Sequence, residues 1–300
     1  MNRQGAIADR LCLKWLSLIA QLPNSTQIGK IHPFVNEYFM DVQLKAEIKQ
    51  SIERSIRNFF QGRQVKVTHV LDLIFPVERR IRSLIGGLET SLGTTVWEPV
   101  AKVLAKANGF TVETKQLLMP NPFPEVLRKE MYELKGLREV RATWIPMADC
   151  VRRLRAAALK SDRTNLTYVP PPPGKGVDVY LCRDGKEYAF DIKTVQPNQG
   201  SGLGFNLQLL EWYAYRFCQD ASANFEARIA FPFNPYQDDW WNHQGRRAYP
   251  LEKGKDAWVQ DEFWDFCSGH TNTWADILQI FDQLGKENFG SQFNDIFYPK

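Results

Sequence analysis

The sequence contains little cysteine and little histidine. Its five cysteines are scattered over 300 residues without a CxxC pair, and its four histidines are not spaced as metal ligands. An odd number of widely separated cysteines argues against a disulfide framework, and the same spacing argues against a structural zinc site. Both absences favour a reducing compartment, so we expect the protein to be cytoplasmic.

Long apolar runs and the common nucleotide and hydrolase motifs are also missing. The apolar stretch LCLKWLSLIAQL is short and contains Lys14, so it predicts a helix and neither a signal peptide nor a membrane span. No GxxxxGK[ST], GxGxxG or GxSxG pattern occurs. Membrane association, use of ATP, dinucleotide binding and α/β-hydrolase chemistry therefore lose their usual support.

The composition is that of an ordinary globular protein. Hydrophobic residues make up 44% of the chain and charged residues 24%, which excludes a disordered chain. The net charge of +4 is mildly basic and is compatible with a polyanionic partner. A chain of this length can form one large domain, or a core with a helical appendage.

Apolar residues recur at helical spacing through the first third of the chain. Residues 6–22 and 36–60 each predict a helix, and residues 71–92 predict another that opens at Pro76 and breaks at Gly86-Gly87. We therefore expect three regions, which are a helical N-terminal region over residues 1–90, an α/β core over residues 91–235, and an aromatic-rich C-terminal region over residues 236–300.

The expected core has a helix, strand, strand, strand, helix, strand order. TTVWEPVAKVLAKANGF predicts a helix that stops at Gly109, and residues 110–119 predict a strand. GVDVYLC and KEYAFDIKTV predict the two arms of a hairpin that turns at Asp184-Gly185. NLQLLEWYAYRFCQ predicts a helix capped by Asn206, and FEARIAFPF predicts the last strand.

The hairpin carries acid and base where a plain hairpin would have valine or threonine. Asp191 and Lys193 lie two residues apart, so on a strand they share a face, and the hairpin brings Asp178 opposite them. Three charged groups then converge on one face of the sheet. Four apolar residues are expected to point the other way, namely Val177, Val179, Phe190 and Ile192.

This arrangement suits hydrolysis of a phosphodiester bond. The reaction needs an activated water and a neutralised leaving oxygen, and Mg²⁺ held by one or two carboxylates can supply both. Asp178 and Asp191 are the candidate metal carboxylates, and the carbonyl of Ile192 is a candidate further ligand. Lys193 would activate the water or offset charge on the attacked phosphate. The alternative is an exposed hairpin in which Asp and Lys form a solvated cross-strand pair.

The order Asp178, twelve residues, then Asp191-Ile192-Lys193, between a preceding helix and a following helix and strand, resembles the PD-(D/E)xK nuclease superfamily. Here Val177 stands where that motif usually has proline. The resemblance implies an α/β fold in which helices flank a central mixed sheet, joined to the helical N-terminal region. In that superfamily an acidic residue of the preceding helix often joins the metal site. Glu98 matches by position, and Glu89 is the second choice.

A narrower resemblance covers residues 71–110, together with HPFVNEYF and the DIKT strand. These segments are similar to TdeIII-type restriction endonucleases. The likeness implies a type II enzyme that acts as a homodimer on double-stranded DNA, at a short palindrome of the GGNCC kind. A palindrome matches the two-fold axis of a dimer. It also implies a cognate methyltransferase in the same system, which need not be a physical partner.

Basic and amide side chains outside the core are candidates for DNA contacts. Arginine reads guanine, asparagine and glutamine read adenine, and basic clusters bind phosphate. For each candidate the alternative is an ordinary solvated surface residue, with arginines paired to local glutamates, and the C-terminal tryptophans are expected in the core or in a dimer interface. The candidates are Arg246, Arg247, Asn242, Gln244, Gln199, Arg152 and Arg153.

Two other functions remain open from the sequence. One is a repair or junction-resolving nuclease with the same core, which would cut structured junctions instead of short defined sites. The other is a non-catalytic DNA-binding protein with a nuclease-like fold, although the complete Asp178, Asp191 and Lys193 set argues against it.

Overall fold

The computed structural model describes residues 40–65, 69–194, 196–198 and 200–299. The predicted helix over residues 6–22, the HPFVNEYF segment and Gln199 lie outside these ranges. The helices are α2 (Val42–Phe60), η2 (Val70–Leu73), α3 (Pro76–Leu92), η3 (Gly93–Trp97), α4 (Glu98–Ala107), α5 (Glu125–Glu139), α6 (Met147–Lys160), α7 (Ser201–Gln219), α8 (Trp240–Ala248), α9 (Asp261–Ser268), α10 (Thr273–Lys286), η4 (Phe289–Phe293) and α11 (Asn294–Phe297). The strands are β1 (Thr111–Val112), β2 (Met119–Asn121), β3 (Thr167–Val169), β4 (Val179–Arg183), β5 (Lys186–Ile192), β6 (Asn224–Phe231) and β7 (Ala257–Val259).

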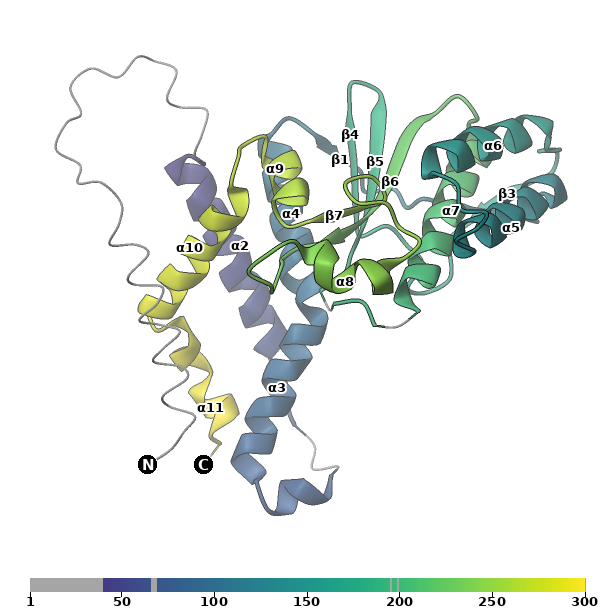
Figure 1. Ribbon diagram of the computed structural model, residues 1–300. Coiled ribbons are helices and arrows are strands. Elements are labelled where there is room, and N and C mark those ends of the chain that lie inside the picture. The colour runs from purple at the N-terminus through teal and green to yellow at the C-terminus, as the bar shows by residue number, and fades with distance from the viewer. Residues whose placement is uncertain (1–39, 66–68, 195, 199, 300) are drawn as a thin grey trace, which may run out of the picture. The chain divides into compact units, whose positions relative to one another are not determined.

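A mixed sheet of five strands lies at the centre, in the order β1-β4-β5-β6-β7 (Figure 1). The β1–β4 and β4–β5 pairs are antiparallel, whereas β5, β6 and β7 run parallel to one another. β2 and β3 form a separate two-stranded antiparallel sheet. The expectation of a mixed sheet flanked by helices is therefore confirmed.

Alternating side chains of the sheet feed two hydrophobic clusters, one on each face. On one face, Ala189, Ala227 and Ile229 pack with α5, α6 and α7. On the other, Phe190 and Ile192 pack with α2, α4, α9 and α10. Because side chains of a strand alternate between its faces, β5 contributes to both clusters and is buried on both sides. This position explains its run of apolar residues.

Elements from both ends of the described chain complete the core. β7 extends the sheet beside β6, and residues of α9 and α10 share a cluster with residues of α2 and α4. Trp97 of η3 contacts the rings of Trp264 and Trp274 edge to face. The division at residues 90 and 235 stays a prediction, although elements on either side of both limits pack together.

Local conformations agree with some predicted boundaries and not with others. Asp184 and Gly185 both have positive φ, at 51° and 72°, as a tight hairpin turn requires, and Gly109 ends α4 at φ 81°. The predicted break at Gly86-Gly87 is wrong, because α3 continues through both residues. A Cβ on Gly87 would lie 3.5 Å from the Phe59 ring, which is an ordinary van der Waals contact.

Two further expectations are corrected. The strand predicted over residues 110–119 pairs with β4 only at Thr111 and Val112. Asn206 does not cap α7, which begins at Ser201 after Gly200 at φ 88°; Asn206 is instead a buried residue of the helix. Among the described residues, no helix is long and apolar enough to cross a membrane.

Candidate active site

The register of the β4–β5 hairpin sets Asp178 opposite Asp191. Val179 pairs with Phe190, so the residue before Val179 faces the residue after Phe190. Two hydrogen bonds extend the ladder to this point. The amide of Asp178 donates to the carbonyl of Phe190 over 3.0 Å, and Asp178 Oδ2 accepts the amide of Ile192 over 2.7 Å. Main-chain geometry therefore fixes the two carboxylates beside each other on one face.

Val177 does not behave as expected. Val179, Phe190 and Ile192 belong to the cluster with α4, whereas Val177 packs against the cluster with α7 on the other side. β4 begins at Val179, so the strict alternation of a strand does not extend back to Val177.

The two carboxylates lie at low exposure, with Asp191 buried and Asp178 half-buried. Asp191 is only 3% exposed. Burial, and next the charge of Asp191, raise the pKa of Asp178 to about 6. Lys193 Nζ lies 2.7 Å from Asp191 Oδ2 as an ion pair, and it stands 5.7 Å from the centre of the Phe205 ring of α7. The low exposure of both acids, with Lys193 beside them, therefore argues against an exposed, solvated pair on this hairpin.

The donor set fits a hard divalent cation. Asp191 Oδ2 is buried and, apart from its ion pair with Lys193, accepts no hydrogen bond in the described part of the chain. Two carboxylates held together at low exposure are stabilised when a cation joins them. Oxygen ligands of this kind suit Mg²⁺, which often keeps several waters and needs few protein ligands.

A third acidic ligand is not gathered at this site. Within the described ranges, no group of three or more His, Cys, Asp or Glu residues is placed to hold a metal ion. Glu98 stands in the first turn of α4 and forms an ion pair with Lys102, one turn along the helix. Glu89 is an exposed residue of α3. The residues present are Asp178 and Asp191, with the carbonyl of Ile192 between Asp191 and Lys193.

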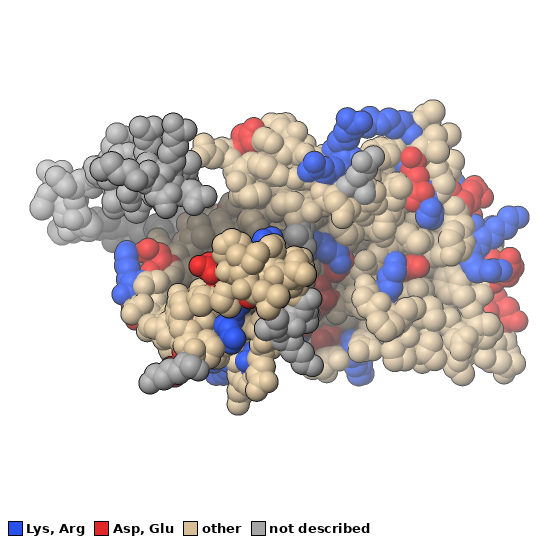
Figure 2. All heavy atoms as spheres, turned by 90° about the horizontal axis from the view of Figure 1, so that it is seen from below, with Lys and Arg blue, Asp and Glu red and all other residues tan. Residues whose placement is uncertain are grey.

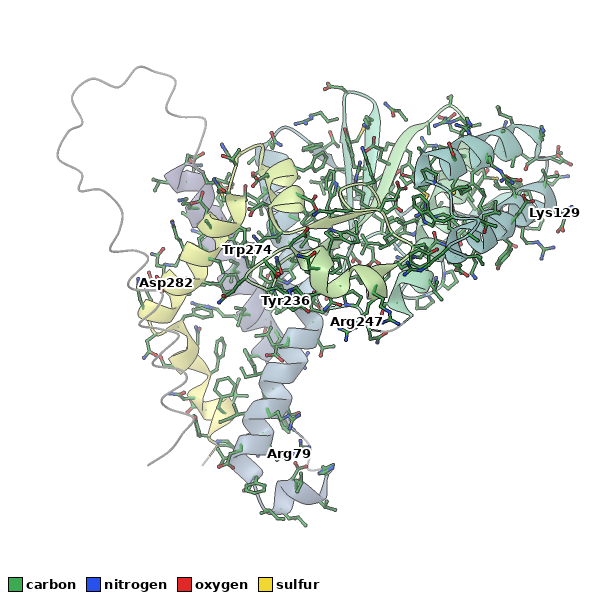
Figure 3. All side chains as sticks on the ribbon, in the orientation of Figure 1. Arg79, Lys129, Tyr236, Arg247, Trp274 and Asp282 are labelled. Atoms are coloured by element: carbon green, nitrogen blue, oxygen red, sulfur yellow. The ribbon has the colours of Figure 1, made fainter. Side chains whose placement is uncertain are left out.

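The segment after the core contains helix α8. Asn242, Arg246 and Arg247 are exposed on it, and Figure 3 shows Arg247 on the side of α8 away from the sheet. Gln244 is only 1% exposed and donates its amide to the hydroxyl of Tyr236. Because a residue on the buried face of a helix cannot meet DNA in this conformation, three of the four candidates here are accessible and Gln244 is not.

Arg152 and Arg153 of α6 both have acidic partners nearby. Arg152 pairs with Asp149 over 3.0 Å, and Arg153 pairs with Glu130 and with Glu133. Basic and acidic side chains mostly lie beside one another over the face seen in Figure 2, without a broad field of one sign. The reading of these arginines as a locally paired helix face therefore has direct support.

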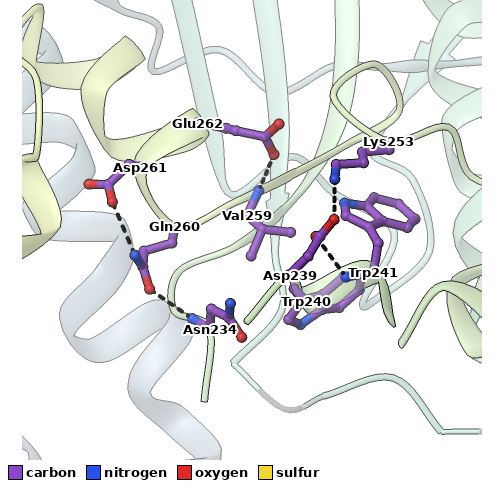
Figure 4. A pocket seen from close by; sticks show the side chains of 9 residues that line it. All are labelled: Asn234, Asp239, Trp240, Trp241, Lys253, Val259, Gln260, Asp261 and Glu262. Atoms are coloured by element: carbon purple, nitrogen blue, oxygen red, sulfur yellow. Dashed lines mark hydrogen bonds and ion pairs between the residues drawn. The ribbon is translucent and has the colours of Figure 1, made fainter. Parts of the chain in front are cut away.

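A hollow of about 230 Å³ lies at the same edge of the sheet as the aspartates, beyond the ends of β6 and β7 (Figure 4). Asn234 and Gln260 follow these strands, and the Asn234 amide donates to Gln260 Oε1 over 3.1 Å. Gln260 has φ 51°, a left-handed conformation that few residues other than glycine adopt. The sequence analysis singled out neither residue. Their proximity follows only from the parallel pairing of β6 and β7, which brings the carboxyl ends of both strands to one edge of the sheet.

Gln208 is a buried residue of α7. It is 4% exposed, and its side-chain amide nitrogen has no hydrogen-bond partner among the described residues. It lies one turn after Phe205, the residue whose ring is near Lys193. The only feature that could have predicted the burial of Gln208 is that α7 is buried along most of its length.

Comparison with known proteins gives one family. The family model described as type II restriction endonuclease, HinfI, matches residues 39–285, which is most of the chain. No solved structure matches. These findings do not confirm the likeness to TdeIII-type enzymes or to the PD-(D/E)xK superfamily, and both stay predictions.

Curated relatives point to the same class. The type II restriction enzyme MjaII of Methanocaldococcus jannaschii is 24% identical over 226 residues, covering 70% of this chain and 56% of that protein. The type II restriction enzymes HgiCII and HgiEI of Herpetosiphon aurantiacus are 29% and 28% identical over 114 and 110 residues. Each of these two matches covers 36% of this chain and 39% of the relative. The chain thus spans about half or less of the length of these relatives.

Proposed function

Because the chain belongs to the HinfI family of type II restriction endonucleases, we propose that it hydrolyses phosphodiester bonds of double-stranded DNA at a short palindrome in a Mg²⁺-dependent reaction. The observation that carries this proposal is the pair of carboxylates of half-buried Asp178 and buried Asp191. Hydrogen bonds between Asp178 and the main chain of β5 hold them on one face, with Lys193 beside them.

Asp178, Asp191 and the carbonyl of Ile192 would hold the metal ion. Mg²⁺, when bound, supplies positive charge at the attacked phosphate and makes a bound water more acidic. The ion pair between Asp191 and Lys193 supports a role for the lysine at the same place. Its ammonium can donate to a phosphate oxygen and orient the attacking water, and it offsets the charge that develops in the transition state.

The substrate and partners follow from the same proposal. We expect a homodimer on double-stranded DNA, and the sequence resemblance favours a palindrome of the GGNCC kind. Exposed Arg246, Arg247 and Asn242 of α8 are the candidates for contacts to bases or phosphates. Arg152 and Arg153 would have to exchange their acidic partners for phosphate to take part. Gln199 is also a candidate for DNA contact, and Glu98 is a candidate for an assisting acid at the metal site. A cognate methyltransferase would protect the host DNA in a cytoplasmic restriction system.

The direct test is cleavage of unmethylated phage DNA with Mg²⁺, with EDTA, and with the Asp191→Ala protein. Discrete fragments that vanish in EDTA and in the variant support the proposal, and sequencing their ends gives the recognition site. Asp282→Asn is a matched control, because that aspartate is exposed on α10 and pairs only with Lys286 in the structure.

Failure has a clear form in this assay. If folded protein cuts no duplex with Mg²⁺ or Mn²⁺, the proposal is wrong. Cleavage of branched junctions alone would assign the chain to repair or resolution. DNA binding without any cleavage would assign it to the non-catalytic class.

A further inference from the structure

The largest concentration of exposed apolar side chains lies at the end of α3 that points away from the sheet (Figure 1). Six of the fifteen large apolar side chains that are exposed in the described part of the chain fall within eight consecutive residues. These six are called the apolar tip here, and they are Val70, Leu71, Leu73, Ile74, Phe75 and Val77. Leu73 is 81% exposed and Ile74 is 66% exposed, so neither is needed by the core of a single chain.

Asp72 and Arg79, which lie within and beside the apolar tip, are paired with each other. His69 caps η2, because its Nδ1 accepts the Leu71 amide over 3.1 Å while its own amide donates to Asp72 over 2.9 Å. Asp72 also accepts a hydrogen bond from Arg79 Nε over 2.9 Å, and Figure 3 shows Arg79 near this end of α3. Covering the tip therefore leaves neither of these charges without a partner, which removes the main penalty of burying a charged surface.

The exposed area reaches or exceeds the upper end of what a monomer usually leaves uncovered. Six side chains of this size, about 40–80% exposed, present roughly 500–700 Å² of apolar surface. The largest apolar patch on a typical monomer is about 300–600 Å². A specific interface buries about 800 Å² on each partner, and its centre is apolar. The apolar tip is thus large enough to form the centre of an interface.

We propose that the apolar tip is the contact through which two copies of this chain associate. In a two-fold dimer each copy offers the same patch, so residues near the axis meet their own counterparts. A patch of one charge would repel itself in that arrangement, whereas an apolar patch with internally paired charges is complementary to itself. This observation favours a second copy over an unrelated protein or DNA as the occupant.

The inference rests on the proposed function, which requires two copies. Each chain carries one Asp178, Asp191 and Lys193 set in its described part, and a palindrome has one scissile bond on each strand. The tip is joined to this set by continuous helix, because α3 runs directly into η3. A Cβ added to Gly93 of η3 would lie 3.6 Å from the carbonyl oxygen of Ile192. Contact at the tip would therefore fix the spacing of two catalytic strands.

The test is sedimentation equilibrium without DNA, across a range of protein concentrations. Wild type is expected to be a dimer, and the Leu73→Ser/Ile74→Ser double variant is expected to have a dissociation constant raised about a hundredfold or more. Leu159→Ser is the control, because Leu159 is also 66% exposed but lies on α6, outside the tip. In wild type, amide exchange over residues 70–77 should slow when the dimer is populated, which needs no variant.

Three results overturn the inference. One is a wild type that stays monomeric at every concentration, and another is a double variant that is folded and still dimeric. Loss of DNA or protein binding by the double variant without a change in its own association also overturns it and assigns the tip to another occupant. The Asp191→Ala protein should remain a dimer. Failure of cleavage and failure of association are therefore separate results.

Discussion

Replacing Asp178 by asparagine is expected to stabilise the metal-free protein at pH 8 while abolishing cleavage. Burial and the neighbouring charge of Asp191 raise the pKa of Asp178 from 3.8 to about 6. The folded state therefore keeps this proton to a higher pH than the unfolded state does. Its contribution to stability is complete below the unfolded pKa of 3.8 and is lost as the pH rises through about 6. At pH 8 the folded protein bears the penalty of the charged pair.

The structure sets the size of the effect. A difference of roughly two pKa units corresponds to about 3 kcal/mol, and partial exposure of Asp178 reduces this to about 1–2 kcal/mol. Asparagine retains a side-chain oxygen that can accept the Ile192 amide now bound over 2.7 Å, so the hairpin contact survives. The gain should shrink to about half between pH 8 and pH 5, and it should vanish only below the unfolded pKa of 3.8.

The assay is urea unfolding in EDTA, at pH 5 and at pH 8, with Asp282→Asn as the exposed control. Added Mg²⁺ should raise the unfolding midpoint of wild type at pH 8 and leave that of Asp178→Asn unchanged, because only a bound ligand stabilises the folded state. If the variant is less stable than wild type by the same amount at both pH values, the carboxyl pair carries no charge penalty and the reasoning is refuted.

Three further changes test other parts of the structure. Lys193→Met should lower cleavage by about 100-fold or more while DNA binding persists, and loss of binding together with activity would contradict the assigned role. Arg138→Met should destabilise the protein by about 3–5 kcal/mol in urea unfolding, because it leaves buried Asp256 without its ion-pair partner. A loss of stability below about 1 kcal/mol would contradict this. Arg247→Ala should weaken DNA binding and reduce the slope of log binding constant against log salt concentration by about one. Gln244→Ala should reduce stability and leave that slope unchanged. The reverse pattern would exchange the roles of the two residues.

The β4–β5 hairpin could be predicted because its signals are local. Asp184-Gly185 dictates a tight turn, and the turn then sets the register that brings Asp178 opposite Asp191. No long-range information is needed for that step. The same reasoning places Lys193 on the face of Asp191, which the ion pair between them bears out.

The predictions that failed depended on distant partners. Asn206 has the sequence context of a helix cap, yet it accepts a hydrogen bond over 2.7 Å from Arg138, which lies 68 residues earlier. Gln244 looks like a DNA contact in an amide-rich stretch, but packing turns it toward Tyr236. Propensity and spacing describe one segment at a time, so they cannot report which face of a segment another element will cover.

Arg138 explains why the edge of the sheet that carries the site depends on the C-terminal part of the chain. Its side chain is fully buried, binds Asn206 of α7 and pairs with Asp256, the residue before β7. The main-chain carbonyl of Asp256 accepts the amide of Ile229 in β6, and Ile229 is the register partner of Asp191 in β5. The buried guanidinium of Arg138 therefore connects α7 and the start of β7 to β6, the strand beside β5. Because a buried charge without its partner is strongly destabilising, loss of residues 256–300 should weaken the support of Asp191 as well as remove an edge strand.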